Sequence, residues 1–358
     1  MKTYRVALVG TGKIVNSHLQ AIKSVGSRAE ICAAVDINEE VVNQFCVHNA
    51  IPNAYTNIEE MLSAEKPDLV CVATPPATHK NICIQALEGG AWVYCEKPLC
   101  GSLAEFDEIH ATEIRTGRYV STVFQWRFGS AVKHIRQLIS NQVLGRPLVA
   151  VCNTLWYRTQ DYYDVSWRGT YTSEFGGPTV GLGIHLMDLC LFLMGDWKEV
   201  KANIATLDRN IEIEDISMAM VRFENDAMGS IINSALSPRQ ETYLRLDFQK
   251  ATLEVTALYR AGNANWSFSL PPDVDDSESA AAWAALSEDF AGSHDQQFRE
   301  ILDSMDQQTA PVVTGAESRR ILEFIASLYK SAVTGQAVRR GDLNPDDSFY
   351  YSNNGKRM

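Results

Sequence analysis

The chain has 358 residues, of which 46% are apolar and 21% charged, and its formal net charge is −12 at pH 7. This length exceeds one ordinary hydrophobic core, so we expect two domains. The acidic balance argues against nucleic acid and membrane surfaces as partners. The eight cysteines are scattered without metal-type spacing, which favours free thiols in a reducing compartment and no metal site. Neither a membrane-length apolar run nor a leader sequence is present, so we expect a cytoplasmic protein.

The first elements have the pattern of a dinucleotide-binding turn. An apolar strand over residues 4–9 leads into Gly10-Thr11-Gly12, and a helical pattern begins at Val15, where Gly or Ala is more usual. Gly10 permits the tight turn and Gly12 lets the backbone approach a pyrophosphate. The helix N-terminus adds amide donors and positive potential. We therefore assign four residues of the turn to a cofactor site: Gly10, Gly12, Lys13 and Ile14.

A second strand, residues 30–35, ends at Asp36. An acid at this place accepts hydrogen bonds from the adenosine 2′-hydroxyl and repels a 2′-phosphate. Ile37 and Asn38 follow, so no arginine is present to neutralise a phosphate. The sequence therefore favours NAD over NADP.

Strands and helices alternate up to about residue 125, which predicts a doubly wound parallel Rossmann sheet over residues 1–125. Thr74-Pro75 and Glu96-Lys97-Pro98 each follow a buried strand, and His79 opens the helix after the first of them. Carboxyl ends of parallel strands share one edge, so we expect both segments, together with His79, to line the cofactor crevice. A lysine held in a partly dry cleft can exchange protons near neutral pH, although Lys97 taken alone also fits a surface lysine that ends a strand.

The pattern changes over residues 126–358. A helix is expected at 130–141, an acidic solvated loop at 272–280, and amphipathic helices at about 294–306 and 316–333. Short turns predict an α+β domain with a large, mainly antiparallel sheet, whose open face suggests a homo-oligomer, a dimer or a tetramer. The expected strands are 148–157, 200–207, 216–223, 228–236, 244–248 and 251–255, and a final strand of the first domain is expected at 119–128.

One glycine-rich segment, residues 176–183, leads into an apolar helix at 184–194. His185 lies in the first turn of that helix, where the dipole favours the neutral ring that a base requires. Asp188 follows at i+3 on the same face. The alternative is a structural histidine on a buried helix, with Asp188 satisfying backbone or arginine groups.

Taken in order, these residues resemble the Gfo/Idh/MocA oxidoreductases over essentially the whole chain. The resemblance includes the turn with His18 in the following helix, the segments described above, and a late pattern of His294, Phe298, Pro311 and Thr314-Gly315. It implies NAD(P)-dependent oxidation of sugars or cyclitols. By resemblance, Lys97 is the catalytic lysine and His185 bonds the reacting hydroxyl, while Glu96 orients either Lys97 or the nicotinamide ribose.

One departure from the family concerns position 181. Family members commonly carry an aspartate four residues before the histidine, and here that residue is Gly181. We expect an aromatic and basic stretch to compensate, because aromatic faces stack on sugar rings and arginines bond hydroxyls. The alternative for each aromatic is a place in the sheet core. The candidate substrate-binding residues are Tyr157, Arg158, Tyr163, Trp167, Arg168, His185 and Asp188.

Three functions remain open at this point. The first is oxidation of a secondary hydroxyl on a sugar, cyclitol or glycoside. The second is glycoside cleavage through transient oxidation at C3 with NAD recycled, which the missing aspartate keeps open. The third is a non-catalytic NAD-binding regulator, which is disfavoured because Lys97 and His185 are both present.

Overall fold

The computed structural model describes residues 2–272 and 276–356. The chain forms two compact units, and it enters each of them twice. Unit 1 contains the chain up to Val123 together with His294–Arg319, and unit 2 contains Phe124–Ser293 and the chain from Arg320 onward. A single boundary at 125/126, as expected from sequence, omits the return of residues 294–319 to the first unit.

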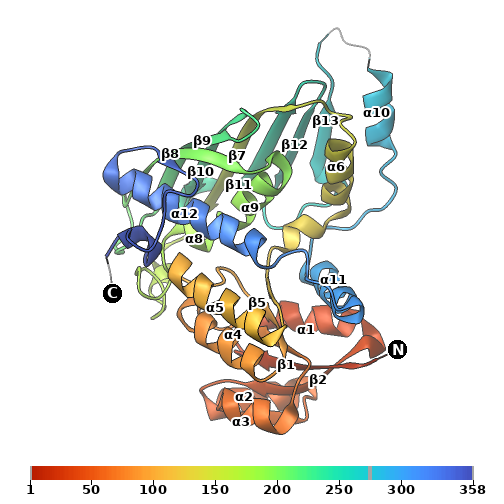
Figure 1. The fold of residues 1–358 in the computed structure, drawn as a ribbon, viewed down its shortest axis with the longest axis vertical. Helices are drawn as coiled ribbons and strands as arrows, with labels where there is room; N and C mark the ends of the chain where they lie inside the picture. The colour runs from red at the N-terminus through yellow and green to blue at the C-terminus, as the bar shows by residue number, and fades with distance from the viewer. Residues whose placement is uncertain (1, 273–275, 357–358) are drawn as a thin grey trace. The chain divides into compact units, whose positions relative to one another are not determined.

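Unit 1 is built on a parallel six-stranded sheet in the order β3-β2-β1-β4-β5-β6 (Figure 1). This is the strand order of a Rossmann fold, which confirms the expected class. The strands are short, and β1, β4, β5 and β6 are almost wholly buried, as parallel strands covered on both faces must be. They are β1 Tyr4–Val9, β2 Ala29–Val35, β3 Asn53–Tyr55, β4 Leu69–Val72, β5 Trp92–Cys95 and β6 Val120–Thr122.

Some helices of unit 1 begin at residues whose side chains accept hydrogen bonds from the first free amides. Asn57 accepts hydrogen bonds from the first amides of α3, and Ser102 does so for α5. The helices are α1 Val15–Ser24, α2 Glu39–Asn49, α3 Ile58–Glu65, α4 His79–Glu88, α5 Leu103–Thr116 and α11 His294–Gln307.

Helix α11 completes the core of unit 1. Its residues Phe298, Ile301 and Leu302 are fully buried, and they share one apolar cluster with Val15 and Leu19 of α1. Burying three such side chains contributes roughly 1.5–3 kcal/mol each. Residues 294–307 are thus part of the nucleotide-binding fold although they come late in the chain.

Unit 2 is built on an eight-stranded sheet in the order β13-β12-β11-β7-β10-β9-β8-β14 (Figure 1). Every neighbouring pair is antiparallel except β7 and β10, which run parallel. This confirms the expected α+β class. The strands are β7 Pro147–Tyr157, β8 Trp197–Ala205, β9 Ile216–Phe223, β10 Met228–Ser234, β11 Leu236–Phe248, β12 Thr252–Ala257, β13 Trp266–Ser269 and β14 Val338–Arg339.

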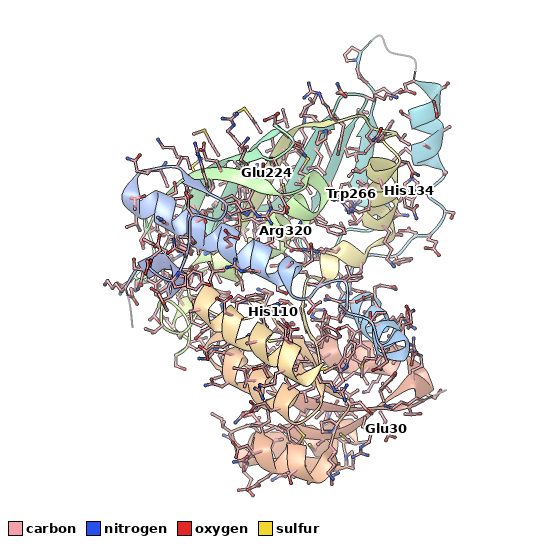
Figure 2. All side chains as sticks on the ribbon, viewed as in Figure 1. Glu30, His110, His134, Glu224, Trp266 and Arg320 are labelled. Carbon is pink, nitrogen blue, oxygen red and sulfur yellow. The ribbon has the colours of Figure 1, made fainter. Side chains whose placement is uncertain are left out.

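Helices cover one face of this sheet. Helix α9 (Ile184–Met194) is apolar almost all round and nearly fully buried, and α12 (Ala316–Thr334) places Phe324 against Trp197 of β8. Helix α10 (Ser277–Ala284) lies beside α6 (Ser130–Ser140), where a ring nitrogen of His134, labelled in Figure 2, is 2.9 Å from the carbonyl oxygen of Ala282. The remaining helices are the short α7 Gln160–Tyr163 and α8 Pro178–Gly181.

Three sequence expectations differ from the structure. The strand expected at 119–128 is only β6, because a 3₁₀ turn at Gln125–Phe128 follows it. The loop expected at 272–280 contains the start of α10, which Asp276 caps, while residues 273–275 lie outside the described residues. Strand β13 had no predicted counterpart.

Candidate active site

The glycine turn after β1 forms an open backbone cradle. Gly10 has φ +91°, and a Cβ there would lie 2.8 Å from the carbonyl of Ala73, so no other residue fits. Gly12 is exposed and has no neighbour within 4 Å of its Cβ position. Lys13 and Ile14 are also exposed on the turn that leads into α1. An accessible backbone before a helix N-terminus fits a pyrophosphate.

Asp36 is held at the carboxyl end of β2, next to this turn. Its Oδ2 accepts hydrogen bonds from the amide of Thr11 at 2.9 Å and from the Thr11 hydroxyl at 2.6 Å. Burial acts to raise the pKa of Asp36, but the hydrogen bonds from Thr11 and the following amides outweigh it and lower the pKa. Asp36 is therefore an ionised acceptor beside the cradle.

The segment after β4 lies at the same edge of the sheet. Thr74 is partly exposed and Pro75 exposed, and a Cβ at Gly10 would lie 2.8 Å from the Thr74 methyl. His79 differs from expectation, because its side chain is fully buried and does not face the crevice. Its ring nitrogens lie 2.8 Å and 2.9 Å from the carbonyl oxygens of Pro98 and Thr74. His79 therefore ties together the segments after β4 and β5, and we no longer count it as a cofactor contact.

Glu96 is the centre of a buried cluster. Its Oε1 lies 3.1 Å from Nε2 of His18 and 3.0 Å from Nε2 of His294, and its Oε2 accepts the amide of Lys97 at 3.3 Å. Burial opposes ionisation of Glu96, but the bonds to the two histidines dominate and hold its pKa well below the usual range. Glu96 is thus a buried carboxylate whose Oε2 lies against the backbone amide of Lys97.

Lys97 follows β5 directly, and its side chain is partly exposed. The Lys97–Pro98 peptide bond is cis. The residues before and after Lys97 are fixed by buried hydrogen bonds, from Glu96 on one side and from His79 to the carbonyl of Pro98 on the other. The lysine stem therefore starts from a rigid position at the ligand-binding edge of the sheet.

In unit 2, His185 lies in the first turn of α9 and is partly exposed. The Trp126 ring stacks on it with ring centroids 5.4 Å apart, and Phe124 meets it edge-on at 6.5 Å. Asp188, one turn further, is 1% exposed and forms an ion pair with Arg127, whose Nε donates to Oδ2 at 2.6 Å. Asp188 therefore fixes α9 to the turn that carries Trp126, and we no longer count it among the substrate contacts.

The aromatic and basic stretch gathers around Tyr162. The guanidinium groups of Arg158 and Arg168 lie over the Tyr162 ring, 5.3 Å and 3.9 Å from its centroid, and Arg168 also lies over Trp167 at 4.0 Å. Tyr157 is 40% exposed. Tyr163, by contrast, is 6% exposed within an apolar cluster that Trp126 also contacts, so it is a core residue here.

The glycine-rich segment is explained by buried polar side chains that approach its backbone. A Cβ at Gly177 would lie 1.7 Å from the carbonyl oxygen of Glu214, and one at Gly183 would lie 1.9 Å from Oδ1 of Asn233. Glu214 accepts the amide of Gly177 at 2.9 Å and the hydroxyl of Tyr329 at 2.8 Å. These contacts position α8 and the start of α9, and hence His185.

Sequence reasoning missed two groups of residues. The cluster around Glu96 joins residues separated by 78 and 198 positions. His18 and His294 entered the sequence analysis only through the family resemblance, and no local pattern placed them against Glu96. Trp126 and Arg127 were missed because residues 119–128 were interpreted as a strand, which assigns them no position near His185.

Comparisons with known proteins identify the family of this chain. Residues 4–124 match the family model "Oxidoreductase family, NAD-binding Rossmann fold", and residues 132–254 match "GFO/IDH/MocA C-terminal domain". Among relatives, D-apiose dehydrogenase of Paraburkholderia graminis is 24% identical, covering 97% of this chain and 92% of its own. D-glucoside 3-dehydrogenase of Escherichia coli is 22% identical, covering 93% and 97%.

The fold is also similar to a solved structure, the WlbA dehydrogenase of Bordetella pertussis in complex with NADH and UDP-GlcNAcA. That structure has a TM-score of 0.85 and 25% identity, and the match covers 96% of this chain and 100% of the other. Within the described residues, no helix combines the length and hydropathy that a membrane crossing requires.

Proposed function

This chain belongs to the Gfo/Idh/MocA oxidoreductase family, and we propose that it oxidises a secondary hydroxyl of a sugar, cyclitol or glycoside with NAD. The observation that carries the proposal is the placement of Lys97 after β5, at the sheet edge where Gly10 and Asp36 form a nucleotide cradle. Ligands of such sheets bind at that edge. Relatives named as dehydrogenases of D-apiose and D-glucosides support the same chemistry.

The residues of unit 1 suit NAD. The Gly10–Ile14 turn would hold the pyrophosphate, and the ionised Asp36 would accept the adenosine ribose hydroxyls and disfavour a 2′-phosphate. Thr74 and Pro75 would line the crevice at the end of β4. When bound, NAD supplies the hydride acceptor.

The proton of the reacting hydroxyl is assigned to Lys97 and His185. Lys97 would take the proton as the hydride leaves the same carbon, and His185 would bond the hydroxyl oxygen and share that proton. Glu96 holds the backbone of Lys97, and the stacked Trp126 holds the ring of His185. Each group is thus orientated by a neighbour from its own unit.

Substrate contacts are assigned to the exposed part of the aromatic and basic stretch. Arg158, Arg168 and Trp167 offer guanidinium donors and a stacking face, and Tyr157 adds an exposed ring. These groups suit a ring with several hydroxyls.

The test is an activity panel that follows NADH absorbance with D-apiose, methyl α-D-glucopyranoside, myo-inositol and UDP-GlcNAcA as substrates. Lys97→Ala is expected to lower kcat roughly 10²–10⁴-fold, the usual worth of a general base, with NADH binding retained. Turnover by Lys97→Ala equal to that of the original chain, or no NADH with any compound, would refute the proposal.

A p-nitrophenyl glucoside distinguishes the alternative of glycoside cleavage, which the glycine at position 181 keeps open. Release of p-nitrophenol without net NADH would indicate that NAD is recycled within the reaction. NADH formation without cleavage would support the dehydrogenase.

We infer that two copies of this chain associate through the uncovered face of the unit 2 sheet. Met218, Met220 and Met228 are 50%, 61% and 57% exposed there, and Val149, which pairs with Met228, is 42% exposed. Such an apolar face on adjacent strands favours a second copy. Light scattering should show an oligomer that Met220→Lys dissociates.

The eight cysteines, all buried free thiols, support a cytoplasmic location.

A further inference from the structure

The backbone conformation at position 181 does not require a glycine. Gly181 ends α8 in helical backbone, where any residue is tolerated. A Cβ at this position would meet a single neighbour within 4 Å, Oε1 of Glu174, at 3.3 Å. The space next to Gly181 is therefore occupied by a carboxylate from another segment.

Glu174 is firmly held in this place. Its side chain is 3% exposed within the turns that precede the glycine-rich segment. Oε1 accepts a hydrogen bond from Nη1 of Arg168 at 2.7 Å, and Oε2 accepts the amide of Gly169 at 2.9 Å. The ion pair with Arg168 and the bond from the Gly169 amide together hold this carboxylate in one position.

The neighbourhood of this carboxylate is the expected substrate face of unit 2. Gly181 and His185 are both partly exposed, whereas the three residues between them are buried. Arg168 joins Glu174 to the stack on Tyr162. Oε1 of Glu174 lies 3.3 Å from the Cβ position of residue 181. The carboxylate oxygens of an aspartate at residue 181 would lie about 2.4 Å from the same Cβ, so the two carboxylates would occupy nearly the same place.

We propose that Glu174 supplies the substrate-positioning carboxylate that position 181 lacks, with Arg168 holding it in place. This inference rests on the proposed function and deepens it. A carboxylate oxygen accepts more than one hydrogen bond, so Arg168 and a substrate hydroxyl can share Oε1. An acid at both positions would bring two like charges into near contact, which explains why Gly181 accompanies Glu174.

The first test moves the acid between the two positions. With the panel sugar that gives the original chain its highest kcat/KM, Glu174→Ala is expected to lower kcat/KM about 10- to 100-fold, mainly through KM. The double variant Glu174→Ala/Gly181→Asp is expected to recover much of that loss, although it cannot restore the bonds to Arg168 and Gly169. Glu224→Ala, which removes an exposed acid of unit 2, is the matched control and should not change kcat/KM.

Recovery of kcat/KM by the double variant would show that Glu174 contributes to substrate binding and does not only hold the loop. The proposal is overturned if the original chain is active and Glu174→Gln has the same KM and kcat. It is also overturned if adding Gly181→Asp to Glu174→Ala restores none of the lost kcat/KM. If the original chain oxidises none of the panel sugars, the proposed function is refuted. The inference about Glu174 is then refuted as well if none of these sugars raises the melting temperature of the NADH complex.

A second test requires no substrate. Gly181→Asp in the original chain should lower the melting temperature, because the new carboxylate meets Glu174, and it should lower it less in the Glu174→Ala background. Equal decreases in both backgrounds would show that the two positions do not interact, which would overturn the proposal.

Discussion

The buried ion pair between Arg127 and Asp188 makes a quantitative prediction about unit 2. Both side chains are almost fully buried, at 1% and 2% exposure, and the Arg127 guanidinium also lies over the Phe192 ring, 4.6 Å from its centroid. Asp188→Ala removes the carboxylate and leaves the guanidinium buried without it. Breaking such a pair costs about 3–5 kcal/mol, because a charge then lacks its compensating partner.

For a unit of about 200 residues, 1 kcal/mol shifts the melting temperature by roughly 2–4 °C, so Asp188→Ala should lower it by about 10 °C. Urea unfolding should show the same loss as an earlier midpoint. Arg127→Met/Asp188→Leu, which replaces both charges by apolar groups of similar volume, should recover most of the stability.

The same variants test whether Asp188 contacts substrate. If the ion pair only stabilises the fold, the KM of the double variant should stay close to that of the original chain. Asp188→Ala should then lower both the melting temperature and the activity. An Asp188→Ala variant that loses less than about 1 kcal/mol would refute the energetic argument. A stable double variant with a greatly raised KM would return Asp188 to the substrate contacts.

Three further predictions concern unit 1. Gly10→Ala should abolish NADH binding measured by fluorescence, because φ +91° and a contact of 2.8 Å leave no room for a methyl group, and unchanged binding would contradict the cradle. Asp36→Ala should narrow the preference for NAD over NADP in kcat/KM by about tenfold or more, and an unaltered ratio would exclude a ribose contact. Burial lowers the pKa of His18 below 6.5, so His18 binds a proton more readily in the unfolded chain than in the folded one. The free energy of unfolding is therefore unaffected by His18 above pH 6.5 and decreases as the pH falls below that value. His18→Gln should therefore reduce the loss of melting temperature between pH 7.5 and pH 5.5, and an identical loss would assign it to other groups.

The parts of the fold that were predictable from sequence were those with local patterns. Gly10, the strand that ends at Asp36, and the apolar helix after residue 183 each carry a periodicity or a turn signal within a few residues. The expected strand at 119–128 failed because an apolar run does not distinguish a strand from a buried 3₁₀ turn.

The parts of the site that could not be predicted depend on contacts between distant segments. His294 contributes to the cluster around Glu96, and no local pattern links two residues 198 positions apart. Glu174 was indistinguishable from a surface acid until its distance to Gly181 was known. Asp188 shows the reverse case, since its i+3 spacing from His185 suggested a shared site and the carboxylate is used by Arg127 instead.

The late return of α11 to unit 1 has a consequence for how the chain is made on the ribosome. The nucleotide-binding unit lacks Phe298, Ile301 and His294 until roughly 170 residues after its last strand have been synthesised, which takes roughly 10–30 s at the usual rate of elongation. During that interval the part of α1 that packs on α11 has no cover. We therefore expect a fragment that stops at residue 125 to aggregate when it is expressed alone.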